Sequence, residues 1–494
     1  MRPKVARADA PKPRMPGREA EDMRVGDLAI VLHSHMPYVE GFGTYPFGEE
    51  WLFDAFARSH LPVLEVAESL TMTITPVLAD QLEAEGVGER MLAFLGEHRV
   101  GAAARDTAQA EPELGPAAES EVERYTGAIG RLEQLGGKPL RAFQRAHEDG
   151  RVALMSSAAT HAVLPKLATI AGRRLQVDAG LRSHRRRFEA DGAPEEVEGF
   201  WLPECAYVPG LEEVLEERGV AYTCLDQSRQ EGRTAALRPI RLPGGTVGFT
   251  IDWPTVELVW SDRGYPSDPA YLEYHRLSIN GMRLWSISGG PYDPAAARAR
   301  AAEHASSFLG AVRDRLESHR AKAGRPGLCV FAIDTELLGA WWSEGPAWLR
   351  EVLQAAEDEG IRLLTLPQAL REHEPEERPA RESSWGEGKS LETWDSPGVA
   401  DLVWGARRLE LRLLRAVEQG LEPAAAERAA RELLAVQSSD WAFMDHRKQA
   451  GDYPFTRVLG HSGALLEAIE SPEAPDPRMR NLVPDLSLAP LLEP

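Results

Sequence analysis

The sequence predicts an α/β fold built on a parallel β-sheet, either an open sheet or a barrel. From Asp27 onward, short apolar runs alternate with longer amphipathic stretches, and most of the runs are continuous rather than alternating. Continuous apolar runs are typical of parallel strands that helices cover on both faces. The repeated order of strand and helix supports the same fold class.

The expected strands are short and follow one another along the first three quarters of the chain. In order they are residues 28–32, 73–78, 152–155, 199–202, 221–225, 247–251, 284–287, 328–333 and 362–366. Between them lie amphipathic segments long enough for helices, among them residues 51–70, 165–187, 294–321 and 346–359. Connections of this length are what parallel strands require.

Two regions break this rhythm. Residues from about 83 to 148 are charged and helical without a strand signal, which predicts a helical insertion. After about residue 375 the strand signals stop, and a polar linker leads to expected helices at 398–418, 423–437 and 454–469. We therefore expect an α/β domain over residues 26–375, with the insertion, and a C-terminal all-helical domain over residues 376–494.

The first 25 residues differ from the rest of the chain. They hold six Lys or Arg by residue 18 and several prolines, but no apolar segment of the kind found in secretory signals. We expect a disordered extension here and a cytoplasmic protein. No run of 18 apolar residues occurs anywhere, so the sequence predicts no membrane span.

Charge and cysteine content narrow the function classes. The chain of 494 residues has 56 basic and 77 acidic side chains, a net charge of −21, and no compact basic stripe. Nucleic acids and anionic membranes are poor partners for such a surface, so a neutral substrate fits better. The three cysteines, Cys205, Cys224 and Cys329, are too few and too widely spaced for a disulfide framework or a zinc knuckle. We expect no cofactor and no metal.

Four polar clusters follow four of the expected strands. They contain His33 and His35 in HSHMPYV, His161 in SSAATHAVLP, Glu204 in WLPECAYVPG and Asp334 in DTELLGAWW. Ligands of parallel α/β folds bind at the carboxyl ends of the strands, where side chains from separate strands converge. Four clusters at one edge therefore predict a site, although each residue alone has a simpler explanation.

Those simpler explanations are structural. A single histidine is more often hydrogen-bonded support than a catalyst, but His33 and His35 are two residues apart on an extended segment and point to one side. Glu204 has apolar neighbours, where an unpaired carboxylate is costly, so it either pairs with a cation or acts in catalysis. Asp334 could cap the next helix. Glu336 is expected to be a supporting group.

The twelve tryptophans are unusually numerous, and several lie in polar or glycine-rich surroundings. Indole faces complement the apolar faces of sugar rings, so we expect about a third of these tryptophans to line a cleft for a long neutral glucan. Two carboxylates, a group of histidines and many tryptophans together suggest glycosyl transfer, with one carboxylate as nucleophile or base and the other as proton donor.

These motifs resemble glycoside hydrolase family 57, in particular its 1,4-α-glucan branching enzymes. The matching stretches run from about residue 28 to residue 461 in family order: HSHMPYV, FGEEWLFDA, THAVLPKL, FWLPECAYVPG, VWSDRGYPSDPAYLEYHR, FAIDTELLGAWWSEGPAWL, SSWGEGKSLETWDSP and SSDWAFM. The resemblance implies an incomplete (β/α)7 barrel with a helical insertion and a C-terminal all-helical domain.

The resemblance also implies a reaction. Glu204 would attack the donor glucan to form a covalent glucosyl-enzyme, and Asp334 would protonate the leaving chain and then deprotonate the 6-hydroxyl of an acceptor. An α-1,4 bond would be cut and an α-1,6 branch formed with retained configuration, so an α-1,4-glucan would be both donor and acceptor.

Further site residues follow from matching positions. The donor sugar would contact His33, His35 and His161, and the remaining expected substrate-binding residues are Trp51, Trp260, Trp341, Trp404, Trp441 and Asp440. One segment departs from the family pattern, because residues 226–239 are short and contain no tyrosine where branching members usually carry a tyrosine-bearing loop. The ratio of branching to hydrolysis therefore stays open.

Three alternatives remain at this point. The nearest is α-amylase or 4-α-glucanotransferase activity within the same family. A second is a metal-dependent carbohydrate deacetylase in which His33, His35 and an Asp would bind zinc. A third is a non-catalytic glucan-binding protein that keeps only the tryptophan cleft. The sequence does not decide donor chain length or oligomeric state.

Overall fold

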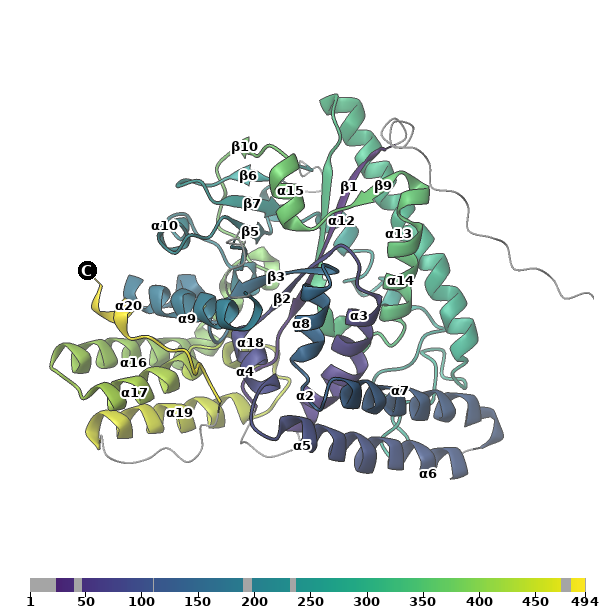
Figure 1. The fold of residues 1–494 in the computed structure, drawn as a ribbon, viewed down its shortest axis with the longest axis horizontal. Helices are drawn as coiled ribbons and strands as arrows, with labels where there is room; N and C mark the ends of the chain where they lie inside the picture. The colour runs from purple at the N-terminus through teal and green to yellow at the C-terminus, as the bar shows by residue number, and fades with distance from the viewer. Residues whose placement is uncertain are drawn as a thin grey trace, which may run out of the picture.

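The structure, a computed structural model, describes residues 24–39, 47–109, 111–189, 198–231, 237–471 and 481–493 (Figure 1). A parallel sheet with the strand order β4-β3-β2-β1-β8 lies at its centre, and β9 also pairs with β1. The strands are β1 (Gly26–Ser34), β2 (Leu70–Ile74), β3 (Val152–Ser157), β4 (Phe200–Trp201), β8 (Leu328–Asp334) and β9 (Ile361–Leu363).

A second sheet continues the curve of the first. Its order is β10-β6-β7-β5, from β5 (Tyr222–Leu225), β6 (Ile240–Arg241), β7 (Val247–Thr250) and β10 (Glu376–Glu377). A parallel bridge between Gly199 and Tyr222 joins the two sheets, and the Asp252 N–H donates to the Val330 carbonyl beyond the end of β7. Strands β8-β1-β2-β3-β4-β5-β7 thus form an incomplete barrel of seven parallel strands, which confirms the predicted fold class.

The central strands owe their stability to burial on both faces. All nine residues of β1 are buried, and Leu28, Ile30 and Leu32 are at most 1% exposed. Each such side chain contributes about 1.5–3 kcal/mol when removed from water. The continuous apolar runs of the sequence therefore identify these strands correctly.

Helices surround the barrel. They include α2 (Glu49–Ala55), α3 (Leu61–Val66), α4 (Pro76–Leu82), α9 (Ile170–Phe188), α12 (Trp253–Val256), α13 (Pro294–Ala323), α14 (Gly345–Ala355) and α15 (Leu366–Glu372). The longest, α13, lies beside α14 (Figure 1). Its N-cap is Asp293, whose carboxylate accepts from the amides of Ala295 and Ala296, and its C-cap is Gly324, which takes the left-handed conformation that stops a helix.

The predicted insertion is helical. It contains α5 (Val87–Ala93), α6 (Gly101–Gln109), α7 (Gly115–Gln134) and α8 (Arg141–Glu148). A buried ion pair anchors it to the barrel, because the Arg58 guanidinium donates to Glu121 of α7 at 2.7 Å and to the Tyr125 hydroxyl at 2.9 Å. Removal of one partner would leave a buried charge uncompensated, which typically costs about 3–5 kcal/mol.

The C-terminal region is helical as expected, with α16 (Ala400–Glu418), α17 (Pro423–Val436), α18 (Ser439–Arg447), α19 (Tyr453–Glu470) and α20 (Ala489–Leu492). Three of these helices, α16, α17 and α19, match the predicted ones, and α18 and α20 are additional. Residues 376–399 stay attached to the barrel, since β10 pairs with β6 and Ser383 bridges Tyr207. We therefore propose that the helical domain begins at α16 instead of at residue 376.

Two strand predictions differ from the structure. Residues 284–287 form only isolated bridges, Leu272 to Ser286 and Trp285 to Pro291, because this segment folds back on itself and does not enter the barrel. The strand expected at 73–78 lies at β2 instead, since Pro76 begins helix α4.

The predicted N-terminal extension lies outside the described residues except for Arg24 and Val25. Within the described ranges, no helix combines the length and the apolar character needed to cross a membrane.

Candidate active site

Five of the predicted site residues meet at the carboxyl ends of the barrel strands: His33, His35, His161, Glu204 and Asp334. In the parallel ladders, His33 of β1 is the register partner of Thr73 on β2 and of Asp334 on β8. Register partners in neighbouring strands project to the same face of a sheet. Strand pairing alone therefore places the His33 imidazole between the Thr73 hydroxyl and the Asp334 carboxyl.

Two other site residues have strained backbones. His161, after β3, and Glu204, in the turn after β4, both have φ of 60°, and Cys205 has φ of 49°. A side chain other than glycine in this region costs on the order of 1–3 kcal/mol, and such strain clusters at functional sites. The strain at Glu204 and His161 fits the functional roles expected for them, although four further described residues other than glycine have a positive φ: Ser69, Lys389, Lys448 and Val483.

An unbroken series of hydrogen bonds links Thr73 to Glu204. His33 Nδ1 lies 2.6 Å from Thr73 Oγ1, and His33 Nε2 lies 2.9 Å from His161 Nε2. His161 Nδ1 lies 2.9 Å from Ser439 Oγ, and the Ser439 hydroxyl donates to Glu204 Oε1 at 2.9 Å. The series thus combines residues of β1 and β2 and of the segments after β3 and β4 with α18 of the C-terminal region.

His35 forms a second contact with α18. Its Nε2 lies 3.1 Å from both carboxylate oxygens of Asp440, and its Nδ1 lies 3.1 Å from Thr75 Oγ1. The His35 amide donates to Glu336 Oε1, which also lies 2.6 Å from His60 Nε2. Glu336 therefore supports the histidine segment, in agreement with the role expected from the sequence.

The two predicted catalytic carboxyls differ in acidity. Burial raises the pKa of Glu204 to about 7, although the Ser439 hydrogen bond opposes the rise. Burial raises the pKa of Asp334 well above its usual range, and the negative charges of Glu336 and Glu204 raise it further. Such separation suits one carboxylate nucleophile and one carboxylic acid that keeps its proton.

The three histidines also differ. Burial, together with the charge of His35, holds the pKa values of His33 and His161 well below the usual range, so both rings are neutral. Burial opposes the charged form of His35, but Asp440 outweighs it and raises its pKa. The His35 ring stacks on the His161 ring with centroids 4.0 Å apart. The site therefore holds one ion pair, His35 with Asp440, beside two neutral imidazoles.

Two predicted substrate-binding tryptophans form an exposed pair. Trp260, just after α12, and Trp341, after β8, are 43% and 41% exposed, with ring centroids 6.0 Å apart. Gly339 permits this turn, because its φ is +107° and a Cβ there would lie 1.9 Å from the Arg58 carbonyl oxygen. Trp51, on α2, is half-buried beside Phe47.

The two C-terminal tryptophans have opposite environments. Trp404, on α16, is 54% exposed, and the Arg407 guanidinium lies 4.6 Å from its ring centroid. Trp441 is 1% exposed, and its Nε1 donates to the Ala435 carbonyl at 2.7 Å. The apolar side of α18 uses the Trp441 ring for its own packing, so the ring offers no free face for the glucan contact expected from the sequence.

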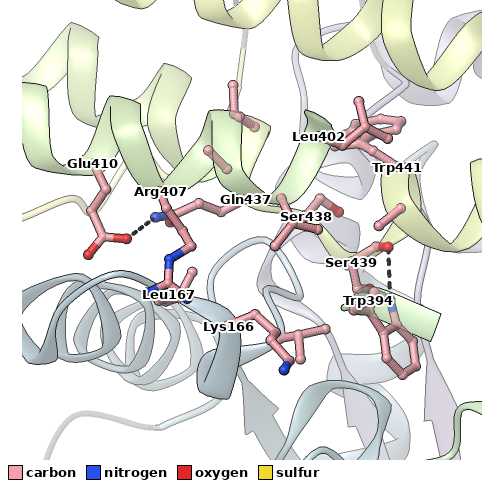
Figure 2. A pocket seen from close by; sticks show the side chains of 15 residues that line it. Lys166, Leu167, Trp394, Leu402, Arg407, Glu410, Gln437, Ser438, Ser439 and Trp441 are labelled. Atoms are coloured by element: carbon pink, nitrogen blue, oxygen red, sulfur yellow. Dashed lines mark hydrogen bonds between the residues drawn. The ribbon is translucent and has the colours of Figure 1, made fainter. Parts of the chain in front are cut away.

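Ser438 and Ser439 line a pocket together with residues of α16, α18 and the segment after β3 (Figure 2). The Ser439 carbonyl accepts from Nε1 of Trp394, another lining residue, at 3.2 Å, and the Ser439 amide donates to the His161 carbonyl at 3.1 Å. The backbone of Ser439 is therefore held at both its amide and its carbonyl.

The sequence did not reveal every member of this site. Thr73, Thr75 and Ser439 were missed, because a hydroxyl in a strand or at a helix start has no signal of its own. The motif SSDWAFM drew attention to Trp441 and Asp440, but nothing in it connects Ser439 with a residue 235 positions earlier. The segment 226–239 is described only at residues 226–231 and 237–239.

Known protein families match both parts of the chain. Residues 29–381 match the sequence profile of glycosyl hydrolase family 57. Residues 406–482 match the profile of the 1,4-alpha-glucan branching enzyme C-terminal region.

Individual relatives agree with these matches. A probable 1,4-alpha-glucan branching enzyme of Mycobacterium tuberculosis is 32% identical over 90% of this chain and 91% of its own. Among solved structures, the family 57 branching enzyme of Pyrococcus horikoshii is 30% identical, with a TM-score of 0.86 over 94% of this chain and 97% of its own. That of Thermococcus kodakaraensis, solved with glucose, is 29% identical, with a TM-score of 0.87 over 94% and 96%.

Proposed function

The chain belongs to glycosyl hydrolase family 57, and from this membership, its C-terminal match and its site geometry we infer that it is a 1,4-α-glucan branching enzyme. Its donor and acceptor would both be α-1,4-glucans, and its product would carry α-1,6 branches. The observation that carries the proposal is the meeting of Glu204 and Asp334 beside a group of histidines, with pKa values raised to different degrees.

In the proposed reaction, Glu204 is the nucleophile. Its Oε1 accepts the Ser439 hydrogen bond, and no described residue bonds to its Oε2, which leaves that oxygen free to attack the anomeric carbon. Asp334 donates its proton to the departing glycosidic oxygen. The glucosyl ester then reacts with an acceptor 6-hydroxyl, whose proton returns to Asp334.

The histidines and Asp440 would hold the donor sugar. The imidazolium of His35, whose ring nitrogens already bond to Thr75 and Asp440, would place a positive charge beside the sugar, while neutral His33 and His161 form the wall beside it. A cation close to the reacting carboxyls also favours the ionised form of Glu204. Trp260 and Trp341 would stack on outer glucose units, with Trp51 and Trp404 as further contacts.

The alternatives differ in what attacks the intermediate or in whether a metal takes part. Water as acceptor would give an α-amylase, and a 4-hydroxyl would give a 4-α-glucanotransferase, with the same two carboxyls. A zinc-dependent deacetylase fits less well, because both ring nitrogens of His33, His35 and His161 already contact protein atoms.

The test is incubation of the purified protein with amylose. We expect the iodine colour to fall without a matching rise in reducing ends, and isoamylase digestion to release short linear chains from the product. Reducing ends that rise in step with the colour loss would instead identify a hydrolase. Glu204→Gln should lose at least about 10³-fold in rate while its circular dichroism and melting temperature stay close to wild type.

A cytoplasmic location belongs to the same proposal.

A further inference from the structure

We propose that Thr73, His33, His161 and Ser439 form a one-directional chain of hydrogen bonds that aims the Ser439 hydroxyl at Glu204 Oε1. Thr73 and Ser439 are then positioning residues for the nucleophile, although Thr73 lies on β2 and is separated from Glu204 by three side chains. The inference rests on the proposed role of Glu204 as an ionised nucleophile.

The direction follows from one end of the chain. An ionised Glu204 has no proton, so Ser439 must donate to it. The Ser439 oxygen can then accept from His161, whose Nδ1 must carry the proton. In a neutral ring the other nitrogen, Nε2, is an acceptor. It therefore accepts a hydrogen bond from the N–H at His33 Nε2, and His33 Nδ1 accepts one from the Thr73 hydroxyl.

The hydrogen-bond chain requires that His33 and His161 be neutral, and the environment of both rings keeps them so. Both rings are at most 4% exposed, and each has its pKa held low by burial and by the nearby cation of His35. His33 is further enclosed by the indole of Trp201, with ring centroids 4.7 Å apart. With one proton for each ring, the protons between Thr73 and Glu204 can all point toward Glu204 or all point away from it.

The ionised Glu204 sets the direction, and the Thr73 hydroxyl, which can donate or accept, completes the hydrogen-bond chain by donating to His33 Nδ1. In Thr73→Val that nitrogen has no donor, so the His33 tautomer with a free Nδ1 is less favoured. At the near end, the Ser439 backbone is fixed by His161 and Trp394, which leaves rotation of its hydroxyl as the main freedom (Figure 2). If the chain pointed the other way, the Ser439 proton would turn to His161 and Glu204 would lose its donor.

A hydrogen bond donated to a carboxylate lowers its pKa, so loss of the donor makes Glu204 harder to ionise. The other titratable and charged groups around Glu204 are His161 after β3, His35 from β1, Asp334 from β8 and Asp440 from α18. Substitution of Thr73 or Ser439 leaves all four of these groups in place. A shift of the acid side of the pH profile therefore reports on the hydrogen-bond chain.

The experiment compares pH profiles of kcat/KM on amylose. The acid limb is the part of the profile where kcat/KM falls with falling pH. Ser439→Ala should move it upward by about one pH unit and lower kcat about 10- to 100-fold. Thr73→Val should move the acid limb in the same direction by about half a unit, although Thr73 does not touch Glu204. The double variant should shift no further than Ser439→Ala alone, because both changes act through one chain.

Matched variants separate this effect from general damage. Thr73→Ser and Ser439→Thr keep the hydroxyl and should retain the wild-type acid limb. Thr71→Val removes a buried hydroxyl of the same strand that accepts from the Leu366 amide, so it should lower the melting temperature without moving the limb. An unmoved limb in Thr73→Val, or additive shifts in the double variant, would overturn the proposal.

A readout without substrate keeps the two proposals distinct. Nitrogen-15 NMR of labelled histidine, assigned by single substitutions, should show His33 protonated at Nε2 and His161 at Nδ1, with mixed tautomers in Thr73→Val. This pattern in a protein that fails to branch amylose would refute the proposed function and support the hydrogen-bond chain. Mixed tautomers in an active wild-type protein would refute the hydrogen-bond chain and leave the proposed function intact.

Discussion

His33 and Asp334 occupy the same register position of the adjacent strands β1 and β8. The side chain expected to donate a proton thus stands beside an imidazole that is neutral because it is buried. A cationic neighbour would favour the ionised carboxylate. Burial raises the pKa of Asp334 and keeps it protonated, and the neutral His33 ring adds no charge that would oppose this.

The first prediction concerns pH. Because the pKa of Glu204 is raised to about 7, kcat/KM should fall about tenfold per unit as the pH drops below that value and the nucleophile becomes protonated. The pKa of Asp334 is raised well above its usual range, so activity should persist on the alkaline side until Asp334 loses its proton. Initial rates at low amylose concentration over a range of pH measure both limbs. An acid limb near pH 4 would contradict the environment described for Glu204.

The second prediction concerns the leaving group. Asp334→Ala should reduce the rate on amylose by at least about 10³-fold, because the departing oxygen then leaves without a proton. A maltooligosyl fluoride needs little acid assistance, so its release of fluoride should fall far less. Glu204→Gln is the matched comparison and should be inactive on both donors. Equal losses of Asp334→Ala on the two donors would show that Asp334 is not the acid.

The third prediction concerns the ion pair of His35 and Asp440. Asp440→Asn removes the charge that raises the pKa of His35, and we expect about tenfold lower activity and a melting temperature lower by on the order of 1–2 °C near pH 6.

The pH dependence of this loss has a definite sign. A raised histidine pKa stabilises the folded state fully below its ordinary value of 6.5, and that stabilisation disappears as the pH rises through the folded pKa. The lowered pKa of Asp440 acts in the opposite sense and stabilises above 3.8. The melting difference between wild type and Asp440→Asn should therefore shrink toward alkaline pH, as calorimetry can measure. A difference that grows with pH would rule out a charged His35.

The fourth prediction concerns the exposed tryptophan pair. Trp341→Ala should raise KM for amylose about tenfold and change kcat little, because the ring would stack on glucose units away from the reacting bond. Leu459→Ala, a change at an even more exposed apolar residue on α19, serves as control and should alter neither constant. A fall in kcat at unchanged KM would place Trp341 at the reacting bond instead.

Much of the fold could be predicted because its strands are buried on both faces. The apolar runs that form β1 and β8 are buried almost throughout, as in a parallel sheet that is covered on both faces. The segment at 284–287 has a similar composition, but whether an apolar run joins a sheet depends on a free neighbouring strand, which sequence does not show. The carboxyl-end clusters led to His33, His161, Glu204 and Asp334 for the same geometric reason.

The rest of the site depends on contacts between distant segments. The role of Ser439 appears only when α18 packs against the segment after β3, and the role of Thr73 only when its strand pairs with β1. Trp441 illustrates the opposite error, since an indole suited to a sugar is equally suited to a helix interior. In the structure, the Trp441 ring is buried in the packing of its helix.

The division of the site between the barrel and α18 has a consequence during synthesis. A ribosome releases the chain from its N-terminus, so the barrel can fold while Ser439 and Asp440 are still untranslated. A half-made chain then holds the proposed nucleophile, Glu204, without its hydroxyl donor and His35 without its counter-ion. Its action on polysaccharide near the translating ribosome would be slowed until the final helices dock.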